Sequence, residues 1–349
     1  MTDHNDKAFA TRTIRAHEQQ SENREHSPAL YLTSSFTFTS AQQAADIFAE
    51  REAAYQYSRF GNPTVQLFEA RMAALEGGAR GTATASGMGA VLTLGLAELE
   101  AGDHIICARN CFGSILNMFS KTFAKYGIET TLVEVTDLDE WKNAVRPNTK
   151  MLFLETPSNP LNEVADLEQL ADIAHQAGAL LVVDNSFLTP ILQQPLKFGA
   201  DLSVHSATKA IDGQGRVQGG VVVGRKELMQ QVQVYMNACG MSMAPFHAWV
   251  LLSGVETLPL RIERQCANAD KIAEWLRRQP QIERVYHSGF ADHPQAELVK
   301  KQQSGGGIVL AFEVRGGQEA AWKLLDSVKI FSKTANLGDV RSTITHPWT

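Results

Sequence analysis

One lysine stands in a setting that is unusual for a surface residue. Lys209 lies within "SVHSATKAIDGQGRVQGG" (203–220), among small and hydroxylated side chains, and several glycines follow it. A surface lysine more often lies on a helix among other charges, and that ordinary explanation stays open for Lys209 taken alone. A lysine amine whose pKa is lowered is, however, a nucleophile for carbonyl carbon atoms.

A second candidate site is the stretch "ASGMGA" at 85–90, which joins an expected strand to an expected helix. Backbone N–H groups at a helix N-terminus bind phosphate, and small residues let the phosphate approach closely. A plain glycine turn is the alternative. The dinucleotide-binding pattern is not met, because Gly87 and Gly89 are followed by Leu92 where a third glycine belongs.

A third candidate is Asp184, which ends the apolar run "LLVVDNSF" at 180–187. A buried carboxylate is costly unless it has a partner, although a helix cap or a loop ion pair would also explain it. A reactive lysine, a strand-end carboxylate and a phosphate cradle are together what pyridoxal 5′-phosphate needs. The lysine would bind the aldehyde as a Schiff base, and the aspartate would keep the pyridine nitrogen protonated. The sequence therefore predicts this cofactor, attached to Lys209.

These residues are spaced along alternating strand and helix patterns. The segment "NPTVQLFEARMAALEGG" reads as a helix with Asn62 as N-cap and Gly77 or Gly78 at its end. Apolar runs separated by helical patterns predict an α/β fold, with a mostly parallel central sheet and helices on both faces. The expected strands are 82–86, 104–109, 129–135, 150–156, 179–186, 202–206 and 219–224.

The pattern changes from about residue 245. A long helical stretch at 250–279, further strands and a helix at 318–327 indicate a smaller α+β domain. The first 40 or so residues are expected to be extended and to form no core. The organisation expected is an extended N-terminal segment contacting a neighbouring subunit, a large cofactor-binding domain, and an incomplete C-terminal small domain, at 1–60, 61–245 and 246–349.

The bulk composition excludes several classes of protein. The 349 residues are 44% hydrophobic and 20% charged, with a net charge of −6 and no basic stripe, so neither nucleic acid nor a membrane surface is an expected partner. Without a signal-like N-terminus, a cytoplasmic protein is expected. The four cysteines lack the spacing of a zinc or redox site, so no metal is predicted and all four are expected to be buried apolar residues.

The motifs together resemble the Cys/Met-metabolism family of pyridoxal-phosphate enzymes, of fold type I. The resemblance covers nearly all of the chain and rests on several separated stretches. They are "YSRFGNPT" at 57–64, "ASGMGA" at 85–90, "ETPSNP" at 155–160, "VVDNSF" at 182–187, "SVHSATK" at 203–209 and "ANLGDVRS" at 335–342.

The resemblance implies a role for each matched residue. Lys209 would be the Schiff-base lysine and Asp184 the partner of the pyridine nitrogen, while Asn159 would contact the cofactor ring oxygen and the substrate carboxylate. Tyr57 and Arg59 would reach the phosphate of a neighbouring subunit, so a dimer is the implied catalytic unit, commonly paired into a tetramer. The implied phosphate site comprises Ser86, Gly87, Met88, Ser206 and Thr208.

Within the family, "SATKAIDGQGRVQGG" (206–220) and "RNCFGS" (109–114) are most similar to members that replace a γ-substituent. The implied reaction makes L-homocysteine from O-succinyl-L-homoserine and hydrogen sulfide. Phe112 stands where other members usually carry a tyrosine, and a phenylalanine ring can stack but cannot move a proton. Open alternatives are a cystathionine γ-synthase and a methionine or cystathionine γ-lyase. A nucleotide-binding dehydrogenase or a non-catalytic protein of the same fold would belong to another class.

Two further expectations concern arginines. Arg216, just past the lysine loop, is a candidate for reading the distal carboxylate of a succinyl group; a surface ion pair is the alternative. The family usually continues about fifty residues beyond the position of Thr349 and supplies there an arginine for the substrate α-carboxylate. The chain is therefore expected to keep the cofactor pocket and to lack that arginine, so that it is catalytically crippled. It is also expected to expose apolar faces at 307–314 and 329–334 and to be prone to aggregation. If the chain is nevertheless fully active, an arginine within it, such as Arg341, would hold the carboxylate.

Overall fold

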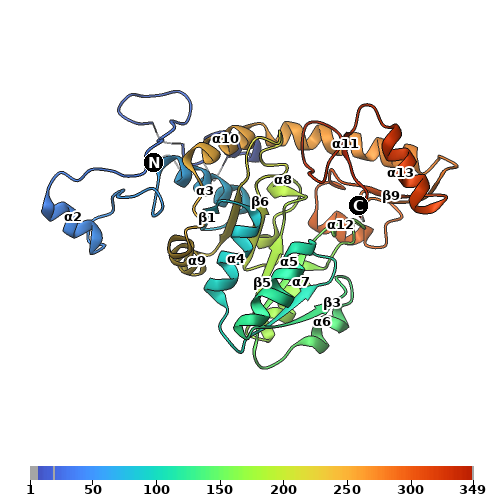
Figure 1. Cartoon of the computed structure of the whole chain (residues 1–349), viewed down its shortest axis with the longest axis horizontal. Coiled ribbons are helices and arrows are strands. Elements are labelled where there is room, and N and C mark those ends of the chain that lie inside the picture. Colours follow the sequence, from blue (N-terminus) through green and yellow to red (C-terminus); the bar gives the residue numbers. More distant parts are fainter. Residues whose placement is uncertain (1–6, 19, 348–349) are drawn as a thin grey trace.

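The computed structural model of the protein describes residues 7–18 and 20–347. Its centre is a seven-stranded sheet with the strand order β1-β7-β6-β5-β4-β2-β3, as Figure 1 shows in part. Each strand agrees to within two residues at either end with one expected from the apolar runs. The strands are β1 (Arg80–Thr84), β2 (His104–Ala108), β3 (Glu129–Val133), β4 (Thr149–Glu155), β5 (Leu180–Asp184), β6 (Leu202–Ser206) and β7 (Gly220–Gly224).

The direction of β7 determines where the strand ends lie. β7 pairs antiparallel with both β1 and β6, whereas the other pairs of this sheet are parallel. Because β1 and β6 both run opposite to β7, they run parallel to each other. The carboxyl ends of six strands therefore lie at one edge of the sheet, which is where open α/β sheets bind their ligands.

The helix at α3 (Pro63–Glu76) forms for the reasons the sequence predicts. The Asn62 side chain accepts the N–H of Thr64, Pro63 stands in the first turn, and Gly77 ends the helix in the left-handed region at φ 78°. A left-handed residue satisfies the last carbonyls of a helix and favours glycine. The helix is thus capped at both ends by residues of its own sequence.

Helices cover both faces of the sheet, as predicted. Alternate residues of β7 face opposite sides of the sheet. Val221 and Val223 pack with α3 and α10 (Pro245–Glu256), whereas Val222 packs with α4 (Gly87–Glu98) and α9 (Lys226–Cys239). Buried branched residues on both faces of a strand are typical of such a sheet. The helices that follow β1 to β7 are α4 (Gly87–Glu98), α5 (Gly113–Asn117), α6 (Leu138–Ala144), α7 (Leu167–Gln176), α8 (Thr189–Leu192) and α9 (Lys226–Cys239), joined by the short helices η1 (Met118–Thr122), η2 (Phe123–Tyr126) and η3 (Pro195–Phe198).

The C-terminal region begins with two helices instead of one long one. α10 (Pro245–Glu256) ends before α11 (Leu258–Leu276), and Pro259 stands in the first turn of α11. Proline lacks the N–H and clashes with the preceding turn, so it begins a helix but interrupts a longer one. In Figure 1, α11 leads from the large sheet towards the small C-terminal elements.

Those elements form two small sheets and two helices. β8 (Ile282–Tyr286) pairs antiparallel with β9 (Ala311–Val314), and β10 (Ser332–Lys333) pairs in parallel with β11 (Thr343–Ile344). The helices are α12 (Ala296–Gln302) and α13 (Gly317–Ser327). α13 has no buried residue and Ile330 is 88% exposed, so this region is covered less completely than the large sheet.

The N-terminal segment departs from the expected extended form in two places. α1 (Phe9–Arg15) packs on α3, where the Arg12 guanidinium donates to the carbonyl of Ala74 at 2.7 Å. Its inward residues Phe9, Thr13 and Ala16 follow helical spacing, a signal that the polar composition around them obscures. Residues 1–6 and 19 lie outside the described chain.

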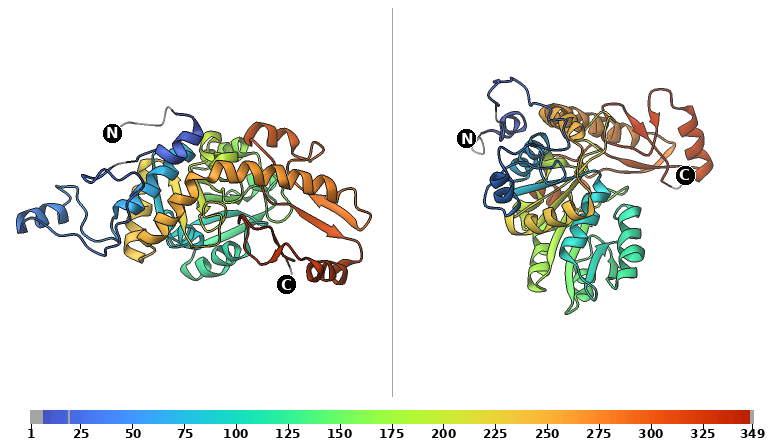
Figure 2. Two further views of the ribbon diagram at one scale, coloured as in Figure 1. Left: turned by 90° about the horizontal axis from the view of Figure 1, so that it is seen from above. Right: turned by 60° about the vertical axis from the view of Figure 1, so that its left-hand side comes forward.

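The second helix in that segment is α2 (Ala41–Phe48), capped by the Ser40 side chain, which accepts the N–H of Gln43. In Figures 1 and 2 it protrudes from one end of the molecule, opposite the C-terminal elements. No helix of the described residues is long and apolar enough to cross a membrane. The expectation for the cysteines is wrong for Cys239, which is exposed at the end of α9; the other three are buried, and all four are free thiols.

Candidate active site

Five chain segments bring polar or aromatic residues to the carboxyl edge of the large sheet. Glu155 and Asp184 are the last residues of β4 and β5, and they lie in register on these neighbouring parallel strands. Ser86 follows β1, Lys209 follows β6, and Phe112 follows β2. The strand order therefore places four of the residues expected to bind one cofactor at one edge, together with Glu155.

Lys209 is half-buried, and its amine makes one hydrogen bond among the described residues. Its Nζ donates to Oδ1 of Asn336 at 3.0 Å, although the two residues are 127 positions apart. Burial lowers the pKa of the Lys209 amine, while the nearby carboxyl groups of Glu155 and Asp184 act in the opposite direction. Lowering the pKa increases the fraction of neutral amine, which is the form that acts as nucleophile or base.

Asp184 is fixed by hydrogen bonds that also reach the lysine segment. Ser186 donates both its hydroxyl (2.6 Å) and its N–H (3.0 Å) to Oδ1 of Asp184. The same hydroxyl accepts the N–H of Ser206 at 2.7 Å, which ties the end of β6 to Asp184. Burial raises the pKa of Asp184, and the Ser186 hydrogen bonds and the charges of His205 and Lys209 oppose that rise. A cationic group placed against Asp184 would favour its ionised form.

Glu155 is a site residue to which the sequence reasoning gave no role. It is only 4% exposed and accepts the N–H of Phe112 at 3.2 Å, so it fixes the backbone at the start of α5. Burial, followed by the neighbouring Asp184, raises its pKa well above the usual range. The signal that could have found it is the one that identified Asp184, a carboxylate at the end of an apolar strand.

The predicted phosphate cradle is the N-terminus of α4. Ser86 is the N-cap, and its hydroxyl accepts the N–H of Gly89 at 3.0 Å. The N–H groups of Gly87 and Met88 have no acceptor among the described residues. A Cβ on Gly87 would lie 2.7 Å from Cβ of Ser206, so only glycine lets the helix terminus come this close to β6. Two free N–H groups beside the Ser206 side chain fit a phosphate.

The other proposed binding residues are placed differently. Thr208 lies in the turn that contains Lys209, and its hydroxyl accepts the N–H of Gly219 at 3.1 Å. Asn159 is half-buried four residues after the end of β4. Tyr57 is exposed, and the Arg59 guanidinium donates to the carbonyl of Asn237 at 2.5 Å, so within one chain neither meets Lys209 in any contact between described residues. Their role towards a neighbouring subunit stays a prediction.

Arg216 has a structural partner, which argues against the substrate role suggested for it. Its Nε donates to Oδ1 of buried Asp212 at 2.9 Å, and its backbone N–H donates to Oδ2 at 2.7 Å. A second guanidinium nitrogen donates to the carbonyl of Asp212 at 3.1 Å. The guanidinium therefore stabilises the loop after Lys209, and we propose no contact with the succinyl carboxylate.

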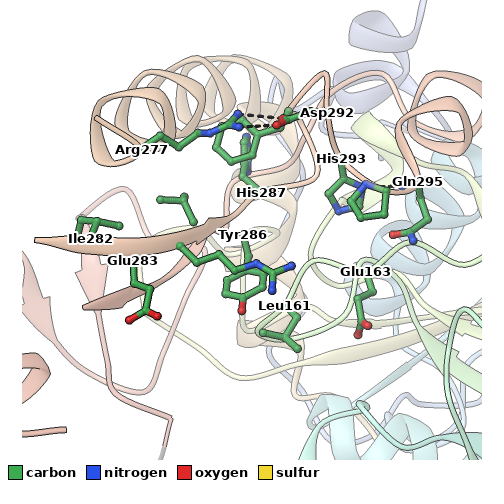
Figure 3. A pocket seen from close by; sticks show the side chains of 14 residues that line it. Leu161, Glu163, Arg277, Ile282, Glu283, Tyr286, His287, Asp292, His293 and Gln295 are labelled. Atoms are coloured by element: carbon green, nitrogen blue, oxygen red, sulfur yellow. Dashed lines mark hydrogen bonds and ion pairs between the residues drawn. The ribbon is translucent and has the colours of Figure 1, made fainter. Parts of the chain in front are cut away.

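A cavity of about 620 Å³ lies elsewhere, beside β8 in the C-terminal region. Figure 3 shows Glu163, Tyr286 and His293 around it, with the ion pair of Arg277 and Asp292 at one side. Its lining includes none of the residues at the carboxyl edge of the large sheet. Chemistry and not cavity size therefore identifies the candidate active site.

Asn336 provides a test of the Lys209 geometry. Asn336→Ala is expected to lower kcat/KM about tenfold, because a lost hydrogen bond to this amine changes the free energy by about 1.4 kcal/mol. Steady-state kinetics measure the effect, with the exposed residue Asn268, changed to alanine, as the matched control. If Asn336→Ala melts like the parent protein and its kcat/KM is unchanged, the hydrogen bond between Asn336 and the Lys209 amine has no role in catalysis.

The sheet is mostly parallel, and its carboxyl edge carries a lysine, a strand-end carboxylate and a helix N-terminus. This combination is typical of an α/β enzyme that binds a phosphate-bearing aldehyde cofactor. Residues 10–349 match the family described as Cys/Met metabolism PLP-dependent enzyme. The chain belongs to this family, and pyridoxal 5′-phosphate is its cofactor.

Individual relatives differ in the reaction that they catalyse. The chain is 50% identical over 342 residues to an O-succinylhomoserine sulfhydrylase of Pseudomonas aeruginosa, covering 98% of this chain and 85% of that protein. It is 42% identical over 321 residues to an L-methionine gamma-lyase of Fusobacterium nucleatum, covering 91% and 81%. The crystal structure of metB from Corynebacterium glutamicum matches 99% of this chain and 89% of that one, with a TM-score of 0.95 and 35% identity. These likenesses confirm the fold-type I expectation.

Proposed function

We propose that the protein catalyses γ-replacement on O-succinyl-L-homoserine, with hydrogen sulfide as the incoming nucleophile and L-homocysteine and succinate as products. The Cγ–O bond breaks, a Cγ–S bond forms, and no oxidant or reductant is needed. The 50% identity to a sulfhydrylase supports the reaction, and the residues at the carboxyl edge of the sheet support the chemistry.

The residues of the chain divide the work. Pyridoxal phosphate, when bound, supplies an aldehyde for the substrate amino group and accepts the electron pair left at Cα. Lys209 holds the cofactor between turnovers and then removes the Cα proton as a general base. Asp184 holds the proton of the pyridine nitrogen, and the Gly87 and Met88 N–H groups with Ser206 hold the phosphate.

Phe112 is the observation that favours an activated ester over a thiol leaving group. Its backbone N–H is held by Glu155 at the site, and its side chain is 53% exposed towards solvent. The ring can stack on the cofactor but carries no exchangeable proton. Succinate leaves readily without a proton, because its carboxyl group is a weak base, whereas a thiolate benefits more from protonation.

A γ-lyase is the second candidate, because an L-methionine gamma-lyase is 42% identical to this chain. A lyase would release a 2-oxo acid and ammonia without any nucleophile. A cystathionine γ-synthase would instead use the thiol of cysteine in place of sulfide. The three reactions therefore differ in the nucleophile that they require and in the product that they release.

The experiment supplies O-succinyl-L-homoserine with sulfide, with cysteine or with neither, and identifies products by mass spectrometry. Homocysteine formed with a kcat/KM at least about tenfold above either alternative supports the proposal. Predominant cystathionine or 2-oxo acid would overturn it in favour of the corresponding alternative.

The Phe112→Tyr variant tests the role of this ring. It is expected to leave turnover of the succinyl ester within about threefold and to raise release of thiol from methionine about tenfold, since a positioned proton donor contributes at least that much. Phe246→Tyr, on the exposed side of α10, is the matched control. If neither rate changes in Phe112→Tyr, the missing hydroxyl does not explain the choice of leaving group.

A further inference from the structure

The guanidinium of Arg261, on α11, is bonded to the turn that carries Lys209. One terminal nitrogen donates to the carbonyl of Ala210 at 2.7 Å, and the other donates to the carbonyls of Ile211 (3.3 Å) and Gly254 (2.7 Å). Nε donates to the hydroxyl of Thr257 at 3.2 Å. The side chain therefore links the carbonyls of the lysine turn to the junction of α10 and α11.

The turn and the helices around this guanidinium lie too close together for a side chain at either of two glycine positions. Gly213 has a φ of +68°, and a Cβ there would lie 2.1 Å from a terminal nitrogen of Arg261. A Cβ on Gly254 would lie 2.2 Å from the carbonyl oxygen of Ile211. Two glycines are thus needed so that the turn and the two helices can come this close.

The same helix also holds the loop that supplies the partner of the Lys209 amine. One turn after Arg261, the Gln265 side chain donates to the carbonyl of Asp339 at 2.9 Å. The Val340 N–H in that loop donates to the carbonyl of Gly213 at 2.8 Å. Because this loop also contains Asn336, α11 contacts both the turn that directly follows Lys209 and the loop that carries the acceptor of its amine.

Charge strengthens the contact with the turn. Burial lowers the pKa of Arg261 to about 10, and Asp212 opposes that fall, so the guanidinium stays protonated at neutral pH. The carbonyl oxygens of Ala210 and Ile211 are strong hydrogen-bond acceptors. Hydrogen bonds from a charged donor to such carbonyls are stronger than neutral ones.

We propose that Arg261 is a positioning residue for Lys209: by holding the carbonyls of Ala210 and Ile211, it sets the backbone from which the lysine amine reaches Asn336 and the cofactor. The proposal rests on the proposed attachment of the cofactor to Lys209. It assigns Arg261 no contact with substrate or cofactor, so its effect must pass through the lysine.

A cycle of variants tests this dependence. Cofactor affinity is measured by equilibrium dialysis for Arg261→Met, first with Lys209 present and then with Lys209→Ala. In the first background we expect affinity to fall about tenfold, because charge-assisted hydrogen bonds that hold the lysine are lost. In the second we expect a change of less than about twofold, because the lysine through which Arg261 acts is gone. Arg264→Met, an exposed arginine on the same helix, is the matched control.

The outcomes separate positioning from mere stability. Equal loss of affinity in both backgrounds, or no loss in the first, would overturn the proposal. Should Arg261→Met fail to melt cooperatively, Arg261→Lys, which keeps the charge and can still reach one carbonyl, replaces it in the same cycle with the same criteria. Failure of the proposed attachment would show itself separately, as cofactor still covalently bound in the Lys209→Ala protein alone.

Discussion

Lys209→Ala is expected to abolish covalent attachment of the cofactor and to lower turnover by about 10⁴-fold or more, since both the proposed attachment point and the proposed general base are lost. The fold should persist. The turn is held by backbone bonds that do not involve the side chain, such as the Gly213 N–H donating to the carbonyl of residue 209 at 2.9 Å. Borohydride reduction followed by peptide mass spectrometry locates the attached cofactor, and circular dichroism reports the fold.

The exposed lysine at 197 provides the matched control, because Lys197→Ala should keep both attachment and turnover. A borohydride-reducible adduct found on a different lysine of the Lys209→Ala protein would refute the assignment. Loss of the cooperative melt would instead show that Lys209 is needed for folding.

Asp184→Asn should lower kcat/KM by about 10²- to 10⁴-fold. The amide keeps the shape of the side chain and can still accept the two Ser186 bonds, but it removes the charge that we propose to hold a proton on the pyridine nitrogen. Removing one member of a buried charged pair costs about 3–5 kcal/mol, and each 1.4 kcal/mol is about tenfold in rate. Steady-state kinetics and the absorbance of the bound cofactor measure the effect.

Two further variants serve as controls for the Asp184→Asn measurement. Asp172→Asn, an exposed change on α7, should have no effect, and Asp184→Glu should keep more activity than the amide because it retains the charge. Near-normal turnover in Asp184→Asn would mean that this carboxylate serves only to join β5 to the Ser206 segment.

The parts of the fold that local chemistry decides could be predicted from sequence. The strand at Leu180–Asp184 is apolar up to its last residue, and the helix after Asn62 has its own cap, proline and terminal glycine. The break at Thr257 was missed although Pro259 signals it. α1 was missed because its three inward residues are dispersed among polar ones, and tertiary packing on α3 provides most of its stability.

Some residues of the candidate site could likewise be predicted from the sequence, and others could not. Lys209 and Asp184 stand out because each follows an apolar strand in unusual company. Asn336 and Arg261 could not be placed from sequence, because their contacts with the lysine turn depend on how the C-terminal elements pack back on the sheet. The partners are 127 and about 50 residues distant along the chain, and no periodicity or spacing signals a contact at such a separation.

The place of β7 in the sheet has a consequence for the order in which the protein assembles. β1 has β7 as its strand neighbour in this sheet, yet 135 residues separate the end of β1 at Thr84 from the start of β7 at Gly220. During synthesis from the N-terminus, β2 to β6 can pair as they emerge, while β1 must wait with its edge open until β7 inserts between it and β6. The helix terminus that we propose to bind phosphate and the lysine turn are therefore expected to be joined in the last step of sheet closure. Pairing of strands so distant in sequence is slow compared with local pairing, so we expect the nascent enzyme to expose an unpaired edge strand until β7 has joined the sheet.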